Sequence, residues 1–191
     1  DFEGWQRQAE GQKTIQQSLE TALSTILNER ILIIGSGRTD SGVHAEGQVA
    51  HFWSTKPIPT ASFYSGVNSL LPHSIAVLKA WRAPNDFHAQ QSAISKTYRY
   101  LIYNNPIPNP LRRRATTWLR RPLSVDKLNE ICKPLAGEHD FKSFRTSGTD
   151  VKTTVRTIHE MLWFERPENE IEFRISGSGF LKQMIRNIVG T

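Results

Sequence analysis

The sequence predicts an α+β fold in which helices cover a mixed or antiparallel sheet. Helical and strand patterns alternate along its 191 residues. Residues 95–103 alternate in polarity as a strand does, and residues 153–165 and 170–176 are typical of a hairpin that turns through residues 166–169. Because a hairpin pairs its strands antiparallel, this pattern disfavours a doubly wound parallel sheet.

The first expected element is a helix that begins at Thr14. Thr14 and Gln17 match a capping box, which satisfies backbone N–H groups in the first turn of a helix. Apolar residues then recur on one helical face, at Ile15, Leu19, Leu23 and Ile26. The apolar run 31–34 predicts a buried strand, and the Gly-rich residues 35–42 predict a loop after it.

Three more elements are expected before residue 82. Residues 49–53 predict a second strand, and residues 75–81 predict a third. Residues 62–71 predict a helix between them. This helix ends before Pro72, because a proline disfavours helical backbone in the residue that precedes it.

The second half of the chain begins with the strand 95–103. Thr97, Arg99 and Leu101 share one face of this strand, and Tyr98, Tyr100 and Ile102 share the other. Residues 104–110 hold three prolines and three asparagines, which predicts a loop. Ser124 caps a helix that runs through Leu135 and is closed by Gly137. A last helix is expected near Phe180.

The composition excludes several classes of protein. Hydrophobic residues make up 38% of the chain, which is enough for a core and excludes a disordered chain. No apolar run approaches the roughly 18 residues that span a bilayer. The single cysteine, Cys132, excludes an internal disulfide framework and a cysteine-based zinc site, and it favours a reducing compartment. The chain begins at Asp1 without a methionine, so we expect it to be truncated at both ends.

The positive charge is concentrated in one stretch of the chain. The formal net charge is +6, and residues 79–121 contain nine Lys and Arg residues but only one acidic residue, Asp86. Such a local excess favours a polyanionic partner. The alternative is a solvated loop whose arginines point into water. We favour binding over this alternative.

Residues 35–42 place Arg38 and Asp40 in a loop of small residues, and His44 follows. Glycines allow sharp turns that hold a charged residue between two elements. Three interpretations stay open from the residues alone: a carboxylate that caps backbone N–H groups, a catalytic carboxylate, or a phosphate-binding loop. The last is weak because the loop lacks the full glycine pattern of a nucleotide site. Ser41, His44 and Asp40 lie too close along one loop for a catalytic triad.

The residues around Asp40 resemble the signature loop of the TruA-type tRNA pseudouridine synthases. That signature covers Gly37–Ala45. Other motifs of the family follow in the same order, and the resemblance covers essentially the whole chain. These motifs are Gly4–Gln8, Thr14–Gln16, Leu19-Glu20, Gln48–Phe52, Val67-Asn68, Leu71-Pro72, Phe87–Ala89, Ser92-Ala93, Tyr98–Tyr100, Gly137–Phe141, Ser143–Arg145, Phe180-Leu181 and Met184–Gly190.

The resemblance implies a pseudouridine synthase fold, with two ferredoxin-like halves and a central basic cleft. We expect an N-terminal half over residues 1–103, which carries the Asp loop, and an incomplete C-terminal half over residues 104–191. The resemblance further implies that the protein isomerises uridine to pseudouridine at positions 38, 39 and 40 of the tRNA anticodon stem-loop. It implies a homodimer that needs no cofactor and no metal. We expect it in the cytoplasm, or in an organelle with its own tRNA.

The resemblance also implies roles for individual residues. Asp40 aligns with the catalytic aspartate, and Tyr98 aligns with the tyrosine that packs against the target base. Arg38, Arg145 and Arg186 match basic positions of the family near that site. From the residues themselves, we expect His44 and His88 to order loops or contact the substrate RNA rather than to bind a metal. The expected contacts to the RNA backbone come from the basic stretch, at Arg112, Arg113 and Arg114. One departure is Gln90, which stands where many members have an arginine.

The residues support this chemistry independently of the resemblance. Isomerisation needs a carboxylate near the ribose, a flat face for the flipped base and cations for phosphates. Spacing alone leaves Tyr98 open as a core tyrosine and Arg186 open as a solvent-facing residue. Two rival functions are a tRNA-binding module without activity and a metal-dependent nuclease. The nuclease is the poorer reading, because Asp40 and Glu46 alone make a weak carboxylate cluster.

Overall fold

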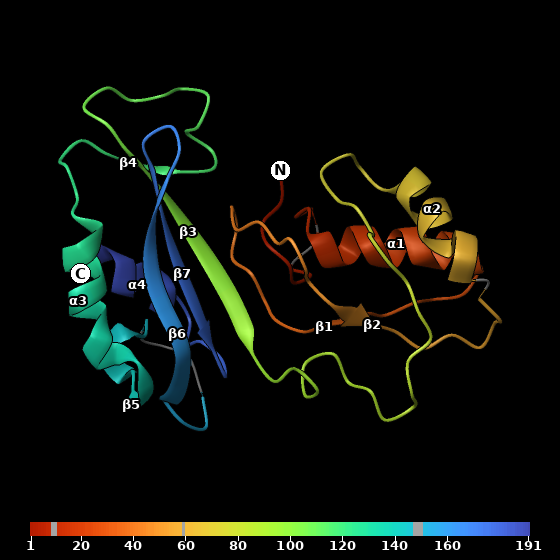
Figure 1. Cartoon of the computed structure of the whole chain (residues 1–191). Coiled ribbons are helices and arrows are strands. Elements are labelled where there is room, and N and C mark those ends of the chain that lie inside the picture. The colour runs from red at the N-terminus through yellow and green to blue at the C-terminus, as the bar shows by residue number, and fades with distance from the viewer. Residues whose placement is uncertain (9–10, 59, 147–150) are drawn as a thin grey trace. The chain divides into compact units, whose positions relative to one another are not determined.

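A computed structural model describes residues 1–8, 11–58, 60–146 and 151–191 of the chain (Figure 1). The chain divides into two compact units, Asp1–Ala93 and Ile94–Thr191. This boundary lies earlier than the one expected after residue 103, because strand β3 (Lys96–Asn104) pairs along its length with strand β7 (Glu170–Gly177) of the second unit. The predicted central basic cleft stays a prediction.

The first unit contains two helices and a two-stranded antiparallel sheet among its described residues. Helix α1 (Ile15–Leu27) begins where the capping pattern predicted, because the Thr14 side chain accepts the Gln17 N–H at 3.3 Å. Strands β1 (Ile34–Gly35) and β2 (Ala50–His51) pair antiparallel, and helix α2 (Thr60–Leu70) follows. Both helices contribute to one hydrophobic core, as do Trp5 and the residues before β1.

The strands predicted in the first unit are shorter than expected or missing. In the run 31–34, Ile31 and Ile33 are buried but Leu32 is 54% exposed, so the segment has one buried face and only its end is a strand. No strand forms over 75–81. The Asn68 side chain accepts the Val77 N–H at 2.7 Å and donates to the Val77 carbonyl at 2.9 Å. A side chain therefore occupies the backbone groups that a neighbouring strand would need.

The second unit is built on a mixed five-stranded sheet in the order β4-β3-β7-β6-β5. Strand β6 (Val155–Arg166) and β7 form the predicted antiparallel hairpin, and β3 pairs antiparallel with β7. Strands β4 (Thr117–Leu119) and β5 (Gly137–Asp140) were not predicted, and they pair parallel to β3 and antiparallel to β6, respectively. This sheet confirms the α+β prediction.

Helices α3 (Val125–Cys132) and α4 (Met184–Gly190) cover one face of this sheet (Figure 1). Tyr98, Tyr100 and Ile102 lie on that face, because their register partners are Ile175, Phe173 and Ile171 of the core. The opposite face carries Arg99 of β3 and the charged residues Glu170, Glu172 and Arg174 of β7. The alternation predicted for residues 95–103 is therefore the alternation between core and charged face.

Both helices of the second unit are shorter than predicted. Ser124 caps α3 by accepting the Lys127 N–H, but the helix passes into a 3-10 turn at Lys133–Leu135 before Gly137. The last helix begins at Met184 rather than near Phe180, because Gln183 adopts left-handed backbone with φ 59°.

Candidate functional site

Asp40 lies in the long loop that joins the two strands of the first unit. Residues 36–49 connect β1 to β2, and a turn closes at Asp40 because its carbonyl accepts the Val43 N–H at 3.2 Å. Arg38, Asp40 and His44 are all exposed. The loop thus presents a carboxylate, a guanidinium and an imidazole to solvent on one short segment.

Polar side chains brace the base of this loop. The Ser36 N–H donates to the Val49 carbonyl at 2.8 Å, which continues the strand pairing by one residue. The Gln48 side chain accepts from the Ser36 hydroxyl at 2.8 Å and donates to the Gly37 carbonyl at 2.5 Å. Gln48 therefore ties the two arms of the loop together immediately before Arg38.

The N-terminal segment contacts the loop on its other side. The Trp5 N–H donates to the Thr39 carbonyl at 3.0 Å, and the Ser41 hydroxyl donates to the Phe2 carbonyl at 3.1 Å. Both residues adjacent to Asp40 are thereby bonded to the same segment. The loop is therefore bonded to this segment through the Thr39 backbone and the Ser41 hydroxyl, while the Asp40 side chain is exposed.

A buried carboxylate holds the strand that leads into the loop. Glu20 of α1 is 3% exposed, accepts the Ile33 N–H at 3.0 Å and forms an ion pair with Arg7. Gln16 donates to the Ile33 carbonyl at 3.2 Å. Both backbone groups of Ile33 thus bond to α1, so the start of the loop is tied to a helix.

His51 and His88 form a second cluster in the first unit. The Ala89 N–H donates to Nδ1 of the buried His51 at 3.1 Å, and the rings of His51 and His88 lie 4.9 Å apart. Burial lowers the pKa of His51, and its electrostatic interaction with the neighbouring His88 ring lowers it further. Nδ1 of His88 accepts the N–H groups of Gln90 and Gln91 at 3.3 and 3.2 Å. Gln90, in the position that departs from the family pattern, thus contributes its backbone to the turn.

Tyr98 lies in the second unit, on β3. Its ring is half-buried and meets the Phe180 ring edge to face, with the centroids 5.2 Å apart. It packs against the core of the second unit. A structural and a base-binding role are both compatible with this half-buried position.

Arg145 and Arg186 lie on segments that are joined by hydrogen bonds. The Asn187 side chain on α4 donates to the Phe144 carbonyl at 2.9 Å, and the Thr146 N–H donates to the Lys182 carbonyl at 3.3 Å. Arg145 lies between Phe144 and Thr146 and is half-buried, whereas Arg186 on α4 is exposed. The segment 144–146 is therefore held against the start of α4.

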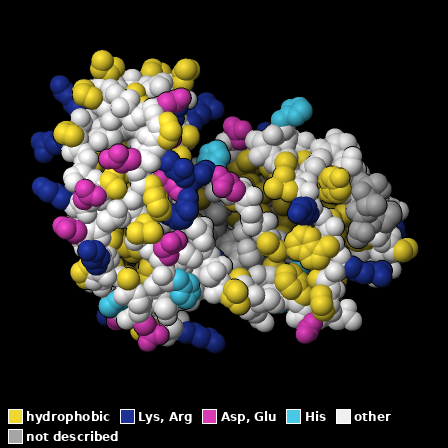
Figure 2. All heavy atoms as spheres, viewed as in Figure 1, with side chains coloured by type: hydrophobic (Ala, Val, Ile, Leu, Met, Phe, Trp, Pro, Cys, Tyr) yellow, Lys and Arg dark blue, Asp and Glu magenta, His cyan; other side chains and the backbone are white. Residues whose placement is uncertain are grey.

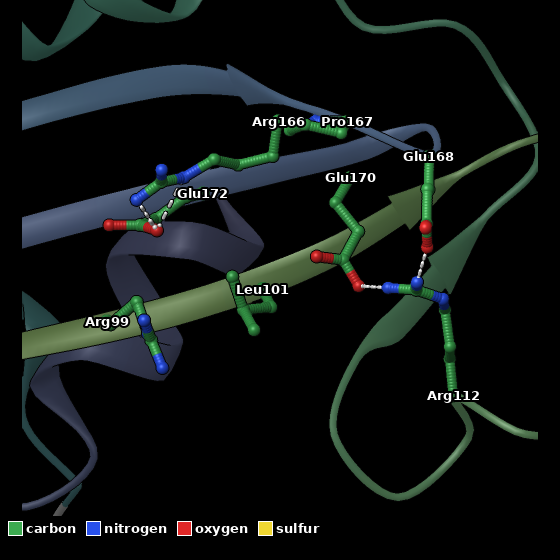
Figure 3. Close-up of a pocket in the computed structure, with 8 residues that line it drawn as sticks. All are labelled: Arg99, Leu101, Arg112, Arg166, Pro167, Glu168, Glu170 and Glu172. Carbon is green, nitrogen blue, oxygen red and sulfur yellow. Dashed lines mark hydrogen bonds and ion pairs between the residues drawn. The ribbon is translucent and has the colours of Figure 1, made fainter. Parts of the chain in front are cut away.

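Arg112 is engaged within the second unit. Its guanidinium pairs with Glu168 and Glu170 at the β6–β7 turn, at one end of a pocket on the charged face of the sheet (Figure 3). Arg113 and Arg114 are exposed. The contact to the RNA backbone expected for these three arginines stays a prediction, and this pairing favours Arg113 and Arg114 for it.

The charge of the second unit is less uniform than the sequence indicates. On the face drawn in Figure 2, Lys and Arg side chains of this unit alternate with Asp and Glu side chains. Two ion pairs of this unit join strand residues that lie outside the basic stretch, since Arg166 and Arg174 both pair with Glu172. Glu172 on β7 is 1% exposed and accepts hydrogen bonds from Arg166 and Arg174 at 2.6–3.1 Å. This network was not predicted, because it joins residues of two strands that meet only in the folded sheet.

The structure groups the predicted residues by unit. Arg38, Asp40 and His44 share one loop of the first unit, and Tyr98, Arg145 and Arg186 belong to the second unit. Gly4, Trp5 and Gln48, which hold the Asp40 loop, were not predicted to do so, although they lie in the Gly4–Gln8 and Gln48–Phe52 motifs. The one sequence feature that could have indicated this role is that the three residues belong to motifs shared with the family.

The described residues contain no group of three or more His, Cys, Asp and Glu side chains that could hold a metal ion. Within the described ranges, no helix is both long and apolar enough to cross a membrane.

Comparison with known proteins identifies the family. A family model described as tRNA pseudouridine synthase matches residues 1–90 and 131–191. The chain is 49% identical to tRNA pseudouridine synthase A of Bdellovibrio bacteriovorus, over 100% of this chain and 74% of that protein. It is 45% identical to the protein of the same name from Bacillus licheniformis and 41% identical to that from Ruminiclostridium cellulolyticum. These matches cover 100% of this chain, with 77% and 78% of the two relatives. The chain therefore belongs to the tRNA pseudouridine synthase family.

Proposed function

We propose that Asp40 is the catalytic residue with which this enzyme isomerises uridine to pseudouridine in tRNA, at positions 38, 39 and 40 of the anticodon stem-loop. The observation that carries this proposal is the construction of the Asp40 loop. The Thr39 carbonyl before Asp40 and the Ser41 hydroxyl after it are both hydrogen-bonded to the N-terminal segment, and the Asp40 side chain itself is exposed. The family match over residues 1–90 includes this loop.

The reaction is a rearrangement within one nucleotide. The bond between ribose C1′ and uracil N1 breaks, the uracil turns, and a bond forms between C1′ and C5. A proton leaves C5 and N1 gains one, so the reaction consumes no second substrate. An exposed carboxylate on a braced loop supports this chemistry, because a catalytic group must be held in its productive geometry before the substrate arrives.

The other residues are proposed to hold the nucleotide. Flipping a base out of an RNA helix costs a few kcal/mol, and stacking of that base on an aromatic ring offsets this cost by about 1–3 kcal/mol. Tyr98 is proposed to supply that ring, since Phe180 holds it edge to face. Arg38, Arg145 and Arg186, with His44 and His88, are proposed to contact the substrate. Arg113 and Arg114 are proposed to contact the RNA backbone.

The assembly and compartment follow the same resemblance. We propose a homodimer in the cytoplasm. Hydrophobic side chains gather on the face of the first unit drawn in Figure 2, which supports a protein–protein contact. The exposed apolar side chains of this unit include Leu32, Trp53, Leu78 and Trp81. Equilibrium sedimentation of the 191-residue chain tests the dimer directly.

Substitution of Asp40 tests the catalytic assignment. Asp40→Asn removes the charge and keeps the shape, so we expect pseudouridine formation to be lost while tRNA binding is retained. Carbodiimide labelling and primer extension on an unmodified tRNA transcript detect the product. Asp126→Asn is the matched control, since it makes the same change at an exposed residue of α3. Full activity of Asp40→Asn contradicts the assignment, and binding without product in the unaltered chain indicates a binding module.

A further inference from the structure

Gly4 makes an unusually close approach to the backbone of the Asp40 loop. A Cβ atom at Gly4 would lie 2.6 Å from the Thr39 carbonyl oxygen, 3.2 Å from the Asp40 carbonyl carbon and 3.2 Å from the Ser41 nitrogen. The φ of Gly4 is +98°, a conformation that residues with side chains rarely adopt. Both observations require glycine at this position.

Hydrogen bonds reinforce this approach on both sides of Asp40. Trp5, the next residue, donates its N–H to the Thr39 carbonyl at 3.0 Å. Phe2 accepts the Ser41 hydroxyl at 3.1 Å. The segment Phe2–Trp5 therefore contacts the residues before and after Asp40, and no atom of the Asp40 carboxylate takes part in these bonds.

The segment is itself anchored to the core of the first unit. The Gly4 carbonyl accepts the Ile15 N–H at 3.2 Å, and the Trp5 carbonyl accepts the Gln16 N–H at 2.9 Å. Trp5 is 6% exposed and its ring lies against Gly35 of β1, where a Cβ would be 2.5 Å from the ring. The segment is thus tied to the first turn of α1 and to β1. Movement of the Asp40 backbone toward the segment is blocked by the core behind it.

We infer that Phe2–Trp5 positions the catalytic carboxylate, with Gly4 as the positioning residue. The close backbone contact sets the place of the Asp40 backbone, and the loop then presents the side chain to the substrate. This inference rests on the proposed catalytic role of Asp40. It adds a requirement outside the loop, at a glycine that has no side chain to take part in the chemistry.

The test compares two glycines that share backbone strain but differ in their surroundings. Gly4 and Gly11 have φ values of +98° and +93°, but a Cβ at Gly11 would meet no described atom within 4 Å. Gly4→Ala and Gly11→Ala thus add the same methyl group to similar backbone, and only the first displaces the Asp40 loop. A displacement near 1 Å costs about 10²-fold in rate.

We expect Gly4→Ala to lower kcat for pseudouridine formation about 10²-fold while the Kd for the tRNA transcript changes less than about twofold. We expect Gly11→Ala to keep both values within about twofold of the unaltered chain. Equal kcat values for the two variants contradict the inference. A parallel loss of kcat and tRNA binding in Gly4→Ala also contradicts it, because that result indicates general disruption.

A milder variant covers the case in which Gly4→Ala does not fold. Ser41→Ala removes one exposed hydrogen bond to Phe2 and leaves the core untouched. We expect it to lower kcat several-fold with KM unchanged, and an unchanged kcat overturns the inference.

A structural readout separates this inference from the proposed function. The Val43 N–H, bonded to the Asp40 carbonyl, reports the loop through its hydrogen exchange. We expect faster exchange in Gly4→Ala than in Gly11→Ala. If Asp40→Asn is fully active, the proposed function fails even where this exchange result holds. If Asp40→Asn is inactive but exchange at Val43 is the same in both glycine variants, the positioning role alone fails.

Discussion

Replacement of Glu172 by Gln tests the charge network on the open face of the second sheet. Glu172 is 1% exposed, and each of its carboxylate oxygens accepts two hydrogen bonds from one arginine. Arg166 bonds Oε2 at 2.9 and 2.6 Å, and Arg174 bonds Oε1 at 3.1 and 2.8 Å. Glu172→Gln keeps the shape of the side chain but leaves one acceptor oxygen and no charge for the two guanidinium groups.

The expected loss of stability follows from the burial of the three partners. Removing one partner of a fully buried ion pair costs about 3–5 kcal/mol. The side chains of Arg166 and Arg174 are 42% and 39% exposed, so water solvates part of their unpaired charge. We therefore expect the free energy of unfolding to fall by about 2–3 kcal/mol. For a chain of this size each kcal/mol lowers Tm by about 2–4 °C, so Tm falls by about 4–12 °C.

The pH dependence of this loss has a defined sign. Burial of Glu172 raises its pKa, but the hydrogen bonds and charges of Arg166 and Arg174 outweigh burial, and the net pKa lies below its ordinary value. The ionised carboxylate thus contributes stability above the unfolded pKa, and this contribution is lost as the pH falls through the folded pKa. The difference between the unaltered chain and Glu172→Gln shrinks in acid.

Thermal and urea unfolding, followed by circular dichroism at pH 7 and at pH 4, measure these differences. Glu168→Gln is the matched control, because Glu168 is 69% exposed at the adjacent turn and Arg112 keeps its pair with Glu170. We expect the control to lose less than about 1 kcal/mol. Equal losses in the two variants, or a loss in Glu172→Gln that is independent of pH, refute the reasoning.

Two further predictions concern RNA binding and the His51 cluster. Each phosphate contact contributes about 0.7–0.9 to the steepness of the plot of log K against log salt concentration. The double variant Arg113→Ala/Arg114→Ala is therefore expected to make this plot for tRNA binding shallower by about 1.4–1.8. An unchanged slope shows that both side chains face only solvent. Neutral His51 accepts the Ala89 N–H, and burial together with the electrostatic interaction with His88 lowers its pKa. The stability that neutral His51 contributes is therefore present above its unfolded pKa and is lost as the pH falls below it. His51→Asn keeps an acceptor near the Nδ1 position but does not titrate. Its free energy of unfolding, measured from pH 8 to pH 5, is therefore expected to fall less in acid than that of the unaltered chain. Identical pH profiles for the two proteins contradict the role of His51.

Local signals predicted the elements whose formation depends on neighbouring residues. The Thr14 cap, the strand through Tyr98 and the hairpin of residues 153–176 all follow from patterns within a few residues, and the structure confirms them. The segment 75–81 has the same kind of apolar pattern, but Asn68 occupies the backbone groups of Val77. The apolar pattern of a segment does not show that a side chain from an earlier helix will bond the backbone groups that strand pairing needs.

Long-range partners account for what the sequence missed at the site. Arg112 belongs to a basic stretch that predicts RNA contact, yet Glu168 and Glu170, far along the chain, take up its charge. Gly4 shows no chemistry of its own in the sequence. Its role appears only when the backbone of Thr39 and Asp40 lies against it. The candidate catalytic and binding residues were therefore predictable from the sequence. The residues that hold them in place were not, because they lie far from them along the chain.

The most direct test of the account is single-turnover isomerisation of an unmodified tRNA transcript by the 191-residue chain and by its Asp40→Asn variant. Release of tritium from uridine labelled at C5 measures the reaction, because pseudouridine formation removes the C5 proton. The account predicts tritium release from the unaltered chain, and no release from Asp40→Asn at tRNA concentrations where filter binding shows both proteins saturated. Release by Asp40→Asn at the rate of the unaltered chain contradicts the central claim that the Asp40 carboxylate, presented by a braced loop, carries the reaction.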